Sequence, residues 1–207
     1  MAETHGTVLM VMESIFPTPA GGGAESQVRT LSLEFIEHGT PVMVLVPMVK
    51  LGPQQPVDVV EGIPVRRIAY PKFPALGSLF LLVALAWHLI LWRQRYRVIR
   101  AHIAGNMSAV CCVVGRPLGK PVLVKLTGMT EMRGGILDRS PGLLSRLRAS
   151  AMRSASAYQA TSERIARMLV ERGFDAAKVL HIPNAVDVER FRRFEPVPGL
   201  RRQLCGD

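Results

Sequence analysis

The chain has 207 residues, which suits one α/β domain with a short extension and leaves room for a large core. Hydrophobic residues make up 48% and charged residues 20%, a globular composition that excludes general disorder. The net charge of +10 is uneven, because residues 1–92 carry 5 Lys or Arg against 7 Asp or Glu, whereas residues 93–207 carry 21 against 9. This asymmetry indicates an anionic partner, such as acidic lipid headgroups or a phosphorylated substrate; the alternative is a solvated arginine-rich surface.

Three further observations narrow the class of protein. The sequence has no zinc-finger spacing, no RNP-like aromatic motif and no recognition-helix pattern, so no nucleic-acid partner is expected. The segment Met1–Gly6 lacks a basic leader, which predicts a cytoplasmic protein without a secretory signal. Cys111, Cys112 and Cys205 form no CxxC motif and make a poor disulfide framework, so we expect reduced thiols, with the adjacent pair in the core.

A glycine-rich loop joins the first predicted strand to the first predicted helix. The apolar run at residues 8–12 predicts a buried strand, and a helical pattern follows Gly22 and Gly23 until Gly39 ends it. Such a turn brings unpaired N–H groups and a partial positive charge to the carboxyl edge of a sheet, which suits a phosphate; the alternative is a plain connection. No GK[ST] or G-x-G-x-x-G pattern is present, so the loop is neither a P-loop nor a dinucleotide fingerprint.

Strands and helices alternate along the rest of the chain. Residues 41–47 predict a second buried strand, which completes a βαβ unit with a right-handed crossover. A loop at 48–62 leads through a short turn into one strand that ends at residue 68, and residues 129–141 predict a mobile loop. Further strands are predicted at 98–102, 121–128, 158–162 and 178–182, and helices at 106–114, 143–154 and 163–172, the last capped by Ser162 and closed by Gly173. The fold class is therefore α/β, a doubly wound, mostly parallel Rossmann-like sheet.

The most apolar segment runs from Leu79 to Trp92. As a helix it reaches about 21 Å, which is too short for a bilayer core of about 30 Å. The favoured interpretation is a helix buried against the sheet, with His88 as a hydrogen-bonded core residue. The alternative is a helix that contacts a membrane, because two tryptophans and a basic run after residue 92 are typical of interfacial anchoring.

Five short patterns occur in a characteristic order and spacing. They are Gly22-Gly23-Ala24-Glu25, the helix end and strand at residues 35–44, the strand end at residues 97–102, the helix start at residues 162–169, and the Ile-Pro-Asn-Ala-Val-Asp turn at residues 182–187. Together they resemble the N-terminal, acceptor-side domain of family-4 glycosyltransferases, which are retaining enzymes of the GT-B fold. The resemblance covers essentially the whole chain.

The resemblance implies one half of a GT-B fold that helps to transfer a sugar from a nucleotide-sugar donor to a phosphorylated, lipid-linked or glycan acceptor. It implies no bound metal and no cofactor besides the nucleotide sugar. The implied substrate- or donor-binding residues are Gly22, Gly23, Glu25, Lys125 and Gly128. His102 and Thr127, at predicted strand ends facing the cleft, are the candidate catalytic residues. An anionic membrane surface is a further expected partner, which places the protein in the cytoplasm or at the inner face of the membrane.

Two departures from the family pattern bear on function. Thr127 stands where many members have a histidine, which puts a histidine-based role in doubt, and Ala185 stands where glycine is usual. Residues 1–194 are predicted to form the Rossmann-like domain and residues 195–207 the start of an interdomain linker, with the C-terminal donor domain and its E-x₇-E-like motif absent. Two alternatives remain open: a non-catalytic subunit that pairs with a separate donor domain or recruits it to membrane, and an unrelated nucleotide-binding Rossmann module.

Overall fold

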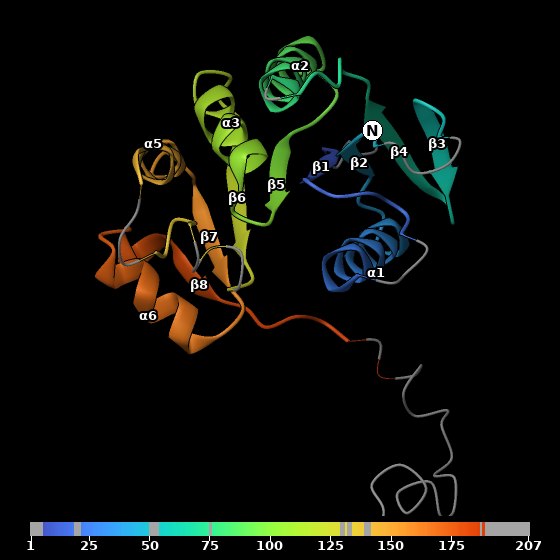
Figure 1. The fold of residues 1–207 in the computed structure, drawn as a ribbon. Coiled ribbons are helices and arrows are strands. Elements are labelled where there is room, and N and C mark those ends of the chain that lie inside the picture. Colours follow the sequence, from blue (N-terminus) through green and yellow to red (C-terminus); the bar gives the residue numbers. More distant parts are fainter. Residues whose placement is uncertain are drawn as a thin grey trace, which may run out of the picture.

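The computed structural model describes residues 6–18, 22–49, 54–74, 76–128, 131, 134–138, 142–186 and 188. Gly21, Asp187, Cys205 and the predicted domain boundary near residue 194 lie outside these residues. Within them the chain folds around one eight-stranded sheet with the order β3-β4-β2-β1-β5-β6-β7-β8 (Figure 1). The strands are β1 Val8–Met12, β2 Val42–Pro47, β3 Val57–Val60, β4 Ile63–Ile68, β5 Val98–His102, β6 Val122–Leu126, β7 Ala157–Ala160 and β8 Val179–His181.

Every neighbouring pair of strands in this sheet is parallel except β3 and β4. The strand order reverses beside β1, since β2 pairs on one side of it and β5 on the other. This is the doubly wound, mostly parallel α/β sheet that the sequence predicts, and the fold class is confirmed. In such sheets ligands bind outside the carboxyl ends of the strands at the reversal of strand order.

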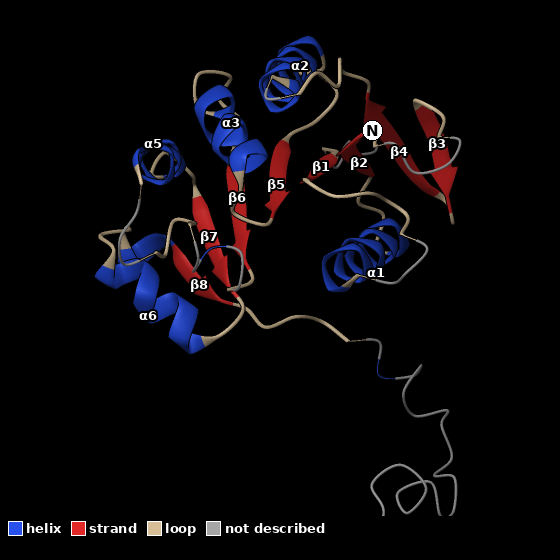
Figure 2. Cartoon of the chain, viewed as in Figure 1, coloured by secondary structure: helices blue, strands red, loops and turns tan. Residues whose placement is uncertain are grey.

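The helices cover the two faces of the sheet unequally, as Figures 1 and 2 show. Helix α1 lies on one face, where Val28 packs with the inward side chains of β1, β2 and β4. Helices α2, α3, α5 and α6 lie on the other face and build the larger hydrophobic core with β5, β6 and β7. The bounds are α1 Gly23–Glu37, α2 Gly77–Leu91, α3 Asn106–Gly115, α5 Leu143–Met152, α6 Glu163–Glu171 and the short 3₁₀ helix η1 Ala176–Lys178.

Predicted helix ends are confirmed in their local chemistry. The Ser162 hydroxyl accepts a hydrogen bond from the Ile165 N–H at 3.4 Å and so caps α6. Gly39 and Gly173 follow α1 and α6 with φ of +74°, a conformation that glycine adopts without steric cost. The adjacent thiols Cys111 and Cys112 are free and buried in α3, as predicted.

Three predictions are corrected. Residues 57–68 form a β3–β4 hairpin rather than a turn and one strand, because Glu61 and Gly62 both take positive φ and reverse the chain tightly. The described part of the loop predicted to be mobile is packed, since Glu131 and residues 135–137 are buried. Helix α2 is buried on one side only, because Leu81, Leu85 and Leu89 face the core while a second set of apolar side chains, which includes Val83 and Trp87, remains exposed.

Candidate functional site

A row of polar side chains crosses the sheet at the carboxyl ends of its central strands. Strand pairing aligns Met12 of β1 with His102 of β5, His102 with Lys125 of β6, and Lys125 with Gln159 of β7. The residues that flank them on β5 and β6 belong to the core beneath α2 and α3. Since side chains alternate along a strand, the row faces the opposite side of the sheet, which is the side of α1. We call His102, Lys125, Gln159 and Arg100, which precedes His102 by two residues on the same face, the basic row.

Three side chains of the basic row are buried although they are polar, and Arg100 is half-buried. His102 is 2%, Lys125 1% and Gln159 2% exposed. The Arg100 guanidinium donates a hydrogen bond to the Gln159 side-chain oxygen, and the Gln159 amide donates to the carbonyl of Ile182 at 2.9 Å. Lys125 therefore does not extend to bulk water, which excludes the interpretation of a strand-end lysine that merely reaches the solvent.

The segment after β8 runs past this row towards α1. It is held at one end by the bond from Gln159 to Ile182, and at the other by Gln27 of α1, whose amide donates to the carbonyl of Ala185 at 2.5 Å. Figure 1 shows this segment leaving β8 and passing the carboxyl ends of the strands on its way towards α1. Ala185, the residue that replaces the usual glycine, thus takes part in the contact through its backbone.

The electrostatics of the basic row favour an anion. Burial first, and then the charges of Arg100 and Lys125, lower the pKa of His102 well below its ordinary value. Burial, followed by Arg100, lowers the pKa of Lys125 to about 8. Both ring nitrogens of His102 lack a hydrogen-bond partner among the described residues. The ion pairs that the described residues form do not involve the basic row. Clustered basic groups without a carboxylate are compensated most directly by a bound anion.

The predicted glycine-rich loop lies at the N-terminus of α1. Gly22 is the N-cap residue, no side chain caps the helix, and a Cβ on Gly23 would meet nothing within 4 Å, so the space beside it is open. Glu25 already has a partner, because the Ser14 hydroxyl from the loop after β1 donates to its carboxylate. A Cβ on Gly22 would overlap that carboxylate. Gly23 offers open backbone, whereas Glu25 braces the loop.

Thr127 and Gly128 follow β6 and are held by the buried carboxylate of Glu131. Its oxygens accept the N–H of Gly128 at 2.8 Å, of Thr127 at 3.1 Å and of Ala104, after β5, at 3.3 Å. The Thr127 hydroxyl lies 3.4 Å from both carboxylate oxygens. Glu131 therefore ties together the two loops that flank His102 and Lys125. Gly128 was predicted to bind substrate or donor, and its N–H is used inside the chain.

The loop after β1 also fills the N-terminus of α3. One Glu13 carboxylate oxygen lies 3.5 Å from the Met107 N–H, and a Cβ on the N-cap residue Gly105 would overlap this carboxylate. Burial raises the pKa of Glu13, while the backbone N–H groups and Arg148 oppose the shift. The α3 N-terminus is thus occupied by the protein's own carboxylate, in contrast to that of α1.

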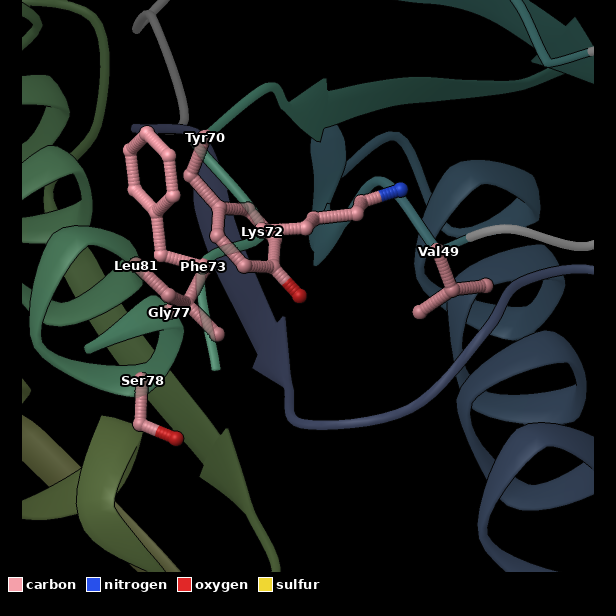
Figure 3. Close-up of a pocket in the computed structure, with 7 residues that line it drawn as sticks. All are labelled: Val49, Tyr70, Lys72, Phe73, Gly77, Ser78 and Leu81. Carbon is pink, nitrogen blue, oxygen red and sulfur yellow. The ribbon is translucent and has the colours of Figure 1, made fainter. Parts of the chain in front are cut away.

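A cavity of about 400 Å³ opens near the ends of β2 and β4. Figure 3 shows side chains from the two strand ends and from the start of α2 around it. The Lys72 ammonium lies 5.9 Å from the ring centre of Tyr70, so the cavity offers a positive charge beside aromatic rings. It is lined by Val49, Tyr70, Lys72, Phe73, Gly77, Ser78 and Leu81.

Comparison with known proteins identifies the family of the chain. Residues 21–190 match the model of Glycosyltransferase Family 4. The chain belongs to that family. No curated protein matches it.

Solved structures share the fold of this Glycosyltransferase Family 4 chain. Anabaena Alr3699/HepE in complex with UDP and glucose has a TM-score of 0.64 and 20% identity, with 97% of this chain and 50% of that chain covered. Sucrose-phosphate synthase from Thermosynechococcus elongatus has a TM-score of 0.65 and 16% identity, with 96% of this chain and 52% of that chain covered. The catalytic domain of Arabidopsis thaliana Starch Synthase IV, bound to ADP and acarbose, has a TM-score of 0.65 and 13% identity, with 90% of this chain and 53% of that chain covered. The chain thus spans about half the length of the structures it resembles.

The sequence of this family-4 chain led us to predict His102 and Lys125 as site residues, but not Arg100, Gln159 and Glu131, which the structure brings beside them. Arg100 and Gln159 were detectable, because a charged or amide side chain in an otherwise apolar strand must face a polar environment. Glu131 carried no such signal, since it lies in a loop. Across the described residues no group of three or more His, Cys, Asp and Glu side chains is placed to hold a metal ion.

Proposed function

We propose that this chain is the N-terminal, acceptor-side domain of a retaining glycosyltransferase that moves a sugar from a nucleotide-sugar donor to an acceptor. Family membership supports the reaction class. The observation that carries the assignment to this face of the sheet is the buried basic row, in which His102 has no partner and Lys125 no carboxylate among the described residues. An unrelated nucleotide-binding module is inconsistent with that membership.

In this proposal Lys125 contacts a phosphate oxygen of the donor or an oxygen of the acceptor, and the open backbone at Gly23 approaches the same ligand. The leaving nucleoside diphosphate develops negative charge, and fixed positive groups in a water-poor site stabilise it. His102 stays neutral at physiological pH because its pKa is lowered, so it accepts or donates one hydrogen bond rather than supplying a charge. Thr127 positions the loop through Glu131.

The cavity beside Tyr70 and Lys72 supports a phosphorylated or lipid-linked acceptor more than a neutral glycan. Its ammonium group suits a phosphate, and its aromatic rings suit an apolar chain or a sugar face. A second Rossmann-like domain or partner subunit would supply the donor side, and the protein would act in the cytoplasm without a metal or cofactor. A non-catalytic subunit remains the alternative until transfer is measured with the donor side present.

The first experiment is an NMR titration of the purified chain, because this method detects binding on the order of millimolar. The probes are UDP, ADP, UDP-glucose and NAD. We expect shifts near Lys125 and Gly23 with the nucleoside diphosphates, and their loss in Lys125→Met. The matched control is Lys120→Met, which removes a lysine just before the amino end of the same strand. Tight NAD binding, or equal binding by both variants, would contradict the proposal.

Transfer itself needs the donor side. The coding sequence beyond Asp207 and its neighbouring genes are searched for a second Rossmann-like domain, which is then joined to or mixed with this chain. Transfer of labelled sugar that requires both parts is the expected result. Binding without any transfer would favour the non-catalytic subunit.

A further inference from the structure

One side of α2 is an exposed apolar stripe. Leu79, Val83, Trp87 and Leu91 are four residues apart and therefore follow one another along the same side of the helix. Phe80 and Ile90 widen this row. The exposed fraction of the six side chains runs from 37% for Phe80 to 62% for Trp87. Contiguous apolar surface of this kind on a folded domain marks an interaction site.

The fold does not need the stripe. Leu81, Leu85 and Leu89 attach the opposite side of α2 to the core, and the helix packs on α3 and β4. The stripe points away from these contacts, and Figures 1 and 2 show α2 at the periphery of the molecule. It continues before the helix into Phe73, whose ring centre lies 5.8 Å from that of Phe80.

The charge around the stripe has one sign. Residues 62–130 contain ten Lys or Arg and no Asp or Glu. Arg93 and Arg95 follow the end of α2 and are exposed, and Lys72 precedes its start. Arg66 of β4 lies over the ring of Trp92 at 5.8 Å. An apolar stripe framed by cations is complementary to a surface that is apolar inside and negative at its boundary.

We propose that α2 docks this domain on an anionic membrane, lying flat with the stripe in the headgroup region and the arginines on acidic lipids. Helices with an apolar face and a basic flank bind in this way. No helix in the described part of the chain is long and apolar enough to cross a bilayer. A second copy of the chain is a poorer occupant, because it would bring two basic rims together. The docking does not depend on sugar transfer.

Vesicle flotation of the full chain tests the proposal. We compare phosphatidylcholine vesicles with vesicles in which phosphatidylglycerol replaces part of the phosphatidylcholine, and expect flotation with the second kind that falls as salt rises. The triple variant Val83→Gln, Trp87→Gln, Leu91→Gln should bind at least about 100-fold more weakly. The double variant Arg93→Gln, Arg95→Gln should bind these vesicles about 30-fold more weakly.

Matched controls come from the opposite face and from α6. Ile36→Gln and Val170→Gln remove exposed apolar side chains elsewhere, and Arg164→Gln with Arg167→Gln removes two exposed arginines of α6. These variants should float like the unaltered chain. Circular dichroism melts of every variant separate loss of binding from loss of folding.

Trp87 supplies an independent readout, because the chain has only two tryptophans. In Trp92→Phe the remaining indole is the exposed one, and its emission should shift to the blue on adding the anionic vesicles. No flotation and no shift would overturn the proposal. So would an oligomer in sedimentation velocity that the triple variant abolishes, since a second copy would then cover the stripe.

Discussion

Replacing Glu131 by alanine should cost the fold much of its stability, because this carboxylate holds two loops of the candidate site. It accepts the N–H groups of Gly128 at 2.8 Å, Thr127 at 3.1 Å and Ala104 at 3.3 Å. Thr127 is exposed and its N–H can turn to water, but Gly128 and Ala104 are buried. Each buried donor without an acceptor costs about 1–3 kcal/mol, so two of them cost about 4 kcal/mol.

Urea unfolding followed by circular dichroism measures this loss. With a slope of about 2 kcal/mol per molar urea, the midpoint of Glu131→Ala should fall by about 2 M. Glu131→Gln keeps one acceptor oxygen but turns an NH₂ group towards a donor. Its urea midpoint should therefore lie between those of Glu131→Ala and the unaltered chain. Thr127→Ala removes only two long contacts of 3.4 Å and should cost less than about 1 kcal/mol.

The control is Glu171→Ala, an exposed carboxylate at the end of α6, which should change stability by less than about 0.5 kcal/mol. A loss below about 1 kcal/mol in Glu131→Ala would refute the reasoning, because the buried N–H groups would then have found other partners. An equal loss in Glu171→Ala would show that the effect is one of net charge.

Three further predictions follow from single contacts. The pKa of Lys125 is about 8 in the folded chain, below its ordinary 10.5, so the unfolded chain binds more protons between these two values. The free energy of unfolding therefore gains a contribution that rises with pH across this window. Lys125→Met should lack that contribution in urea titrations at several pH values, and an identical pH dependence in both proteins would contradict it. Gly135→Ala should lower the melting temperature, because its Cβ would overlap the backbone of Glu131, which cannot turn aside as a side chain can, at a cost of about 1–3 kcal/mol. Gly142→Ala, whose Cβ meets nothing within 4 Å, should be nearly neutral, and equal losses would refute the clash. Arg67→Met should cost about 1–3 kcal/mol, because it leaves the buried carbonyl of Phe16, which accepts from this guanidinium at 3.0 Å, without a donor. Asp58→Asn should cost less, since an amide keeps an acceptor oxygen and the Asp58 side chain is 40% exposed. Chemical unfolding of both variants would expose a wrong ranking.

Much of the fold could be predicted because its signals are local. The apolar runs at residues 8–12 and 42–47 are typical of strands buried on both faces, and glycines after α1 and α6 mark the helix ends. The β3–β4 hairpin was missed because the strand before the Glu61-Gly62 turn has only four residues, none of them buried. So short a stretch shows no reliable periodicity, and it is difficult to distinguish from the loop before it.

The candidate site was predicted as separate residues rather than as an arrangement. His102 and Lys125 were expected at strand ends, and the register places them side by side; their role in binding stays a prediction. Arg100 and Gln159 join them only because β5, β6 and β7 are neighbours in the sheet. The pairing of Glu131 with three backbone N–H groups depends on how two loops meet, which no periodicity encodes.

The α/β class, the helix ends and the charge asymmetry could be recognised from the residues alone, because they follow from side-chain periodicity, capping and composition. The buried side of α2, and the set of polar side chains that share the carboxyl edge, became clear only from the fold. Those outcomes depend on strand order and on packing between segments distant in the chain. The sequence of an apolar helix does not indicate which of its sides packs against the sheet. The burial of Lys125 likewise depends on neighbouring strands and loops that are distant in the sequence.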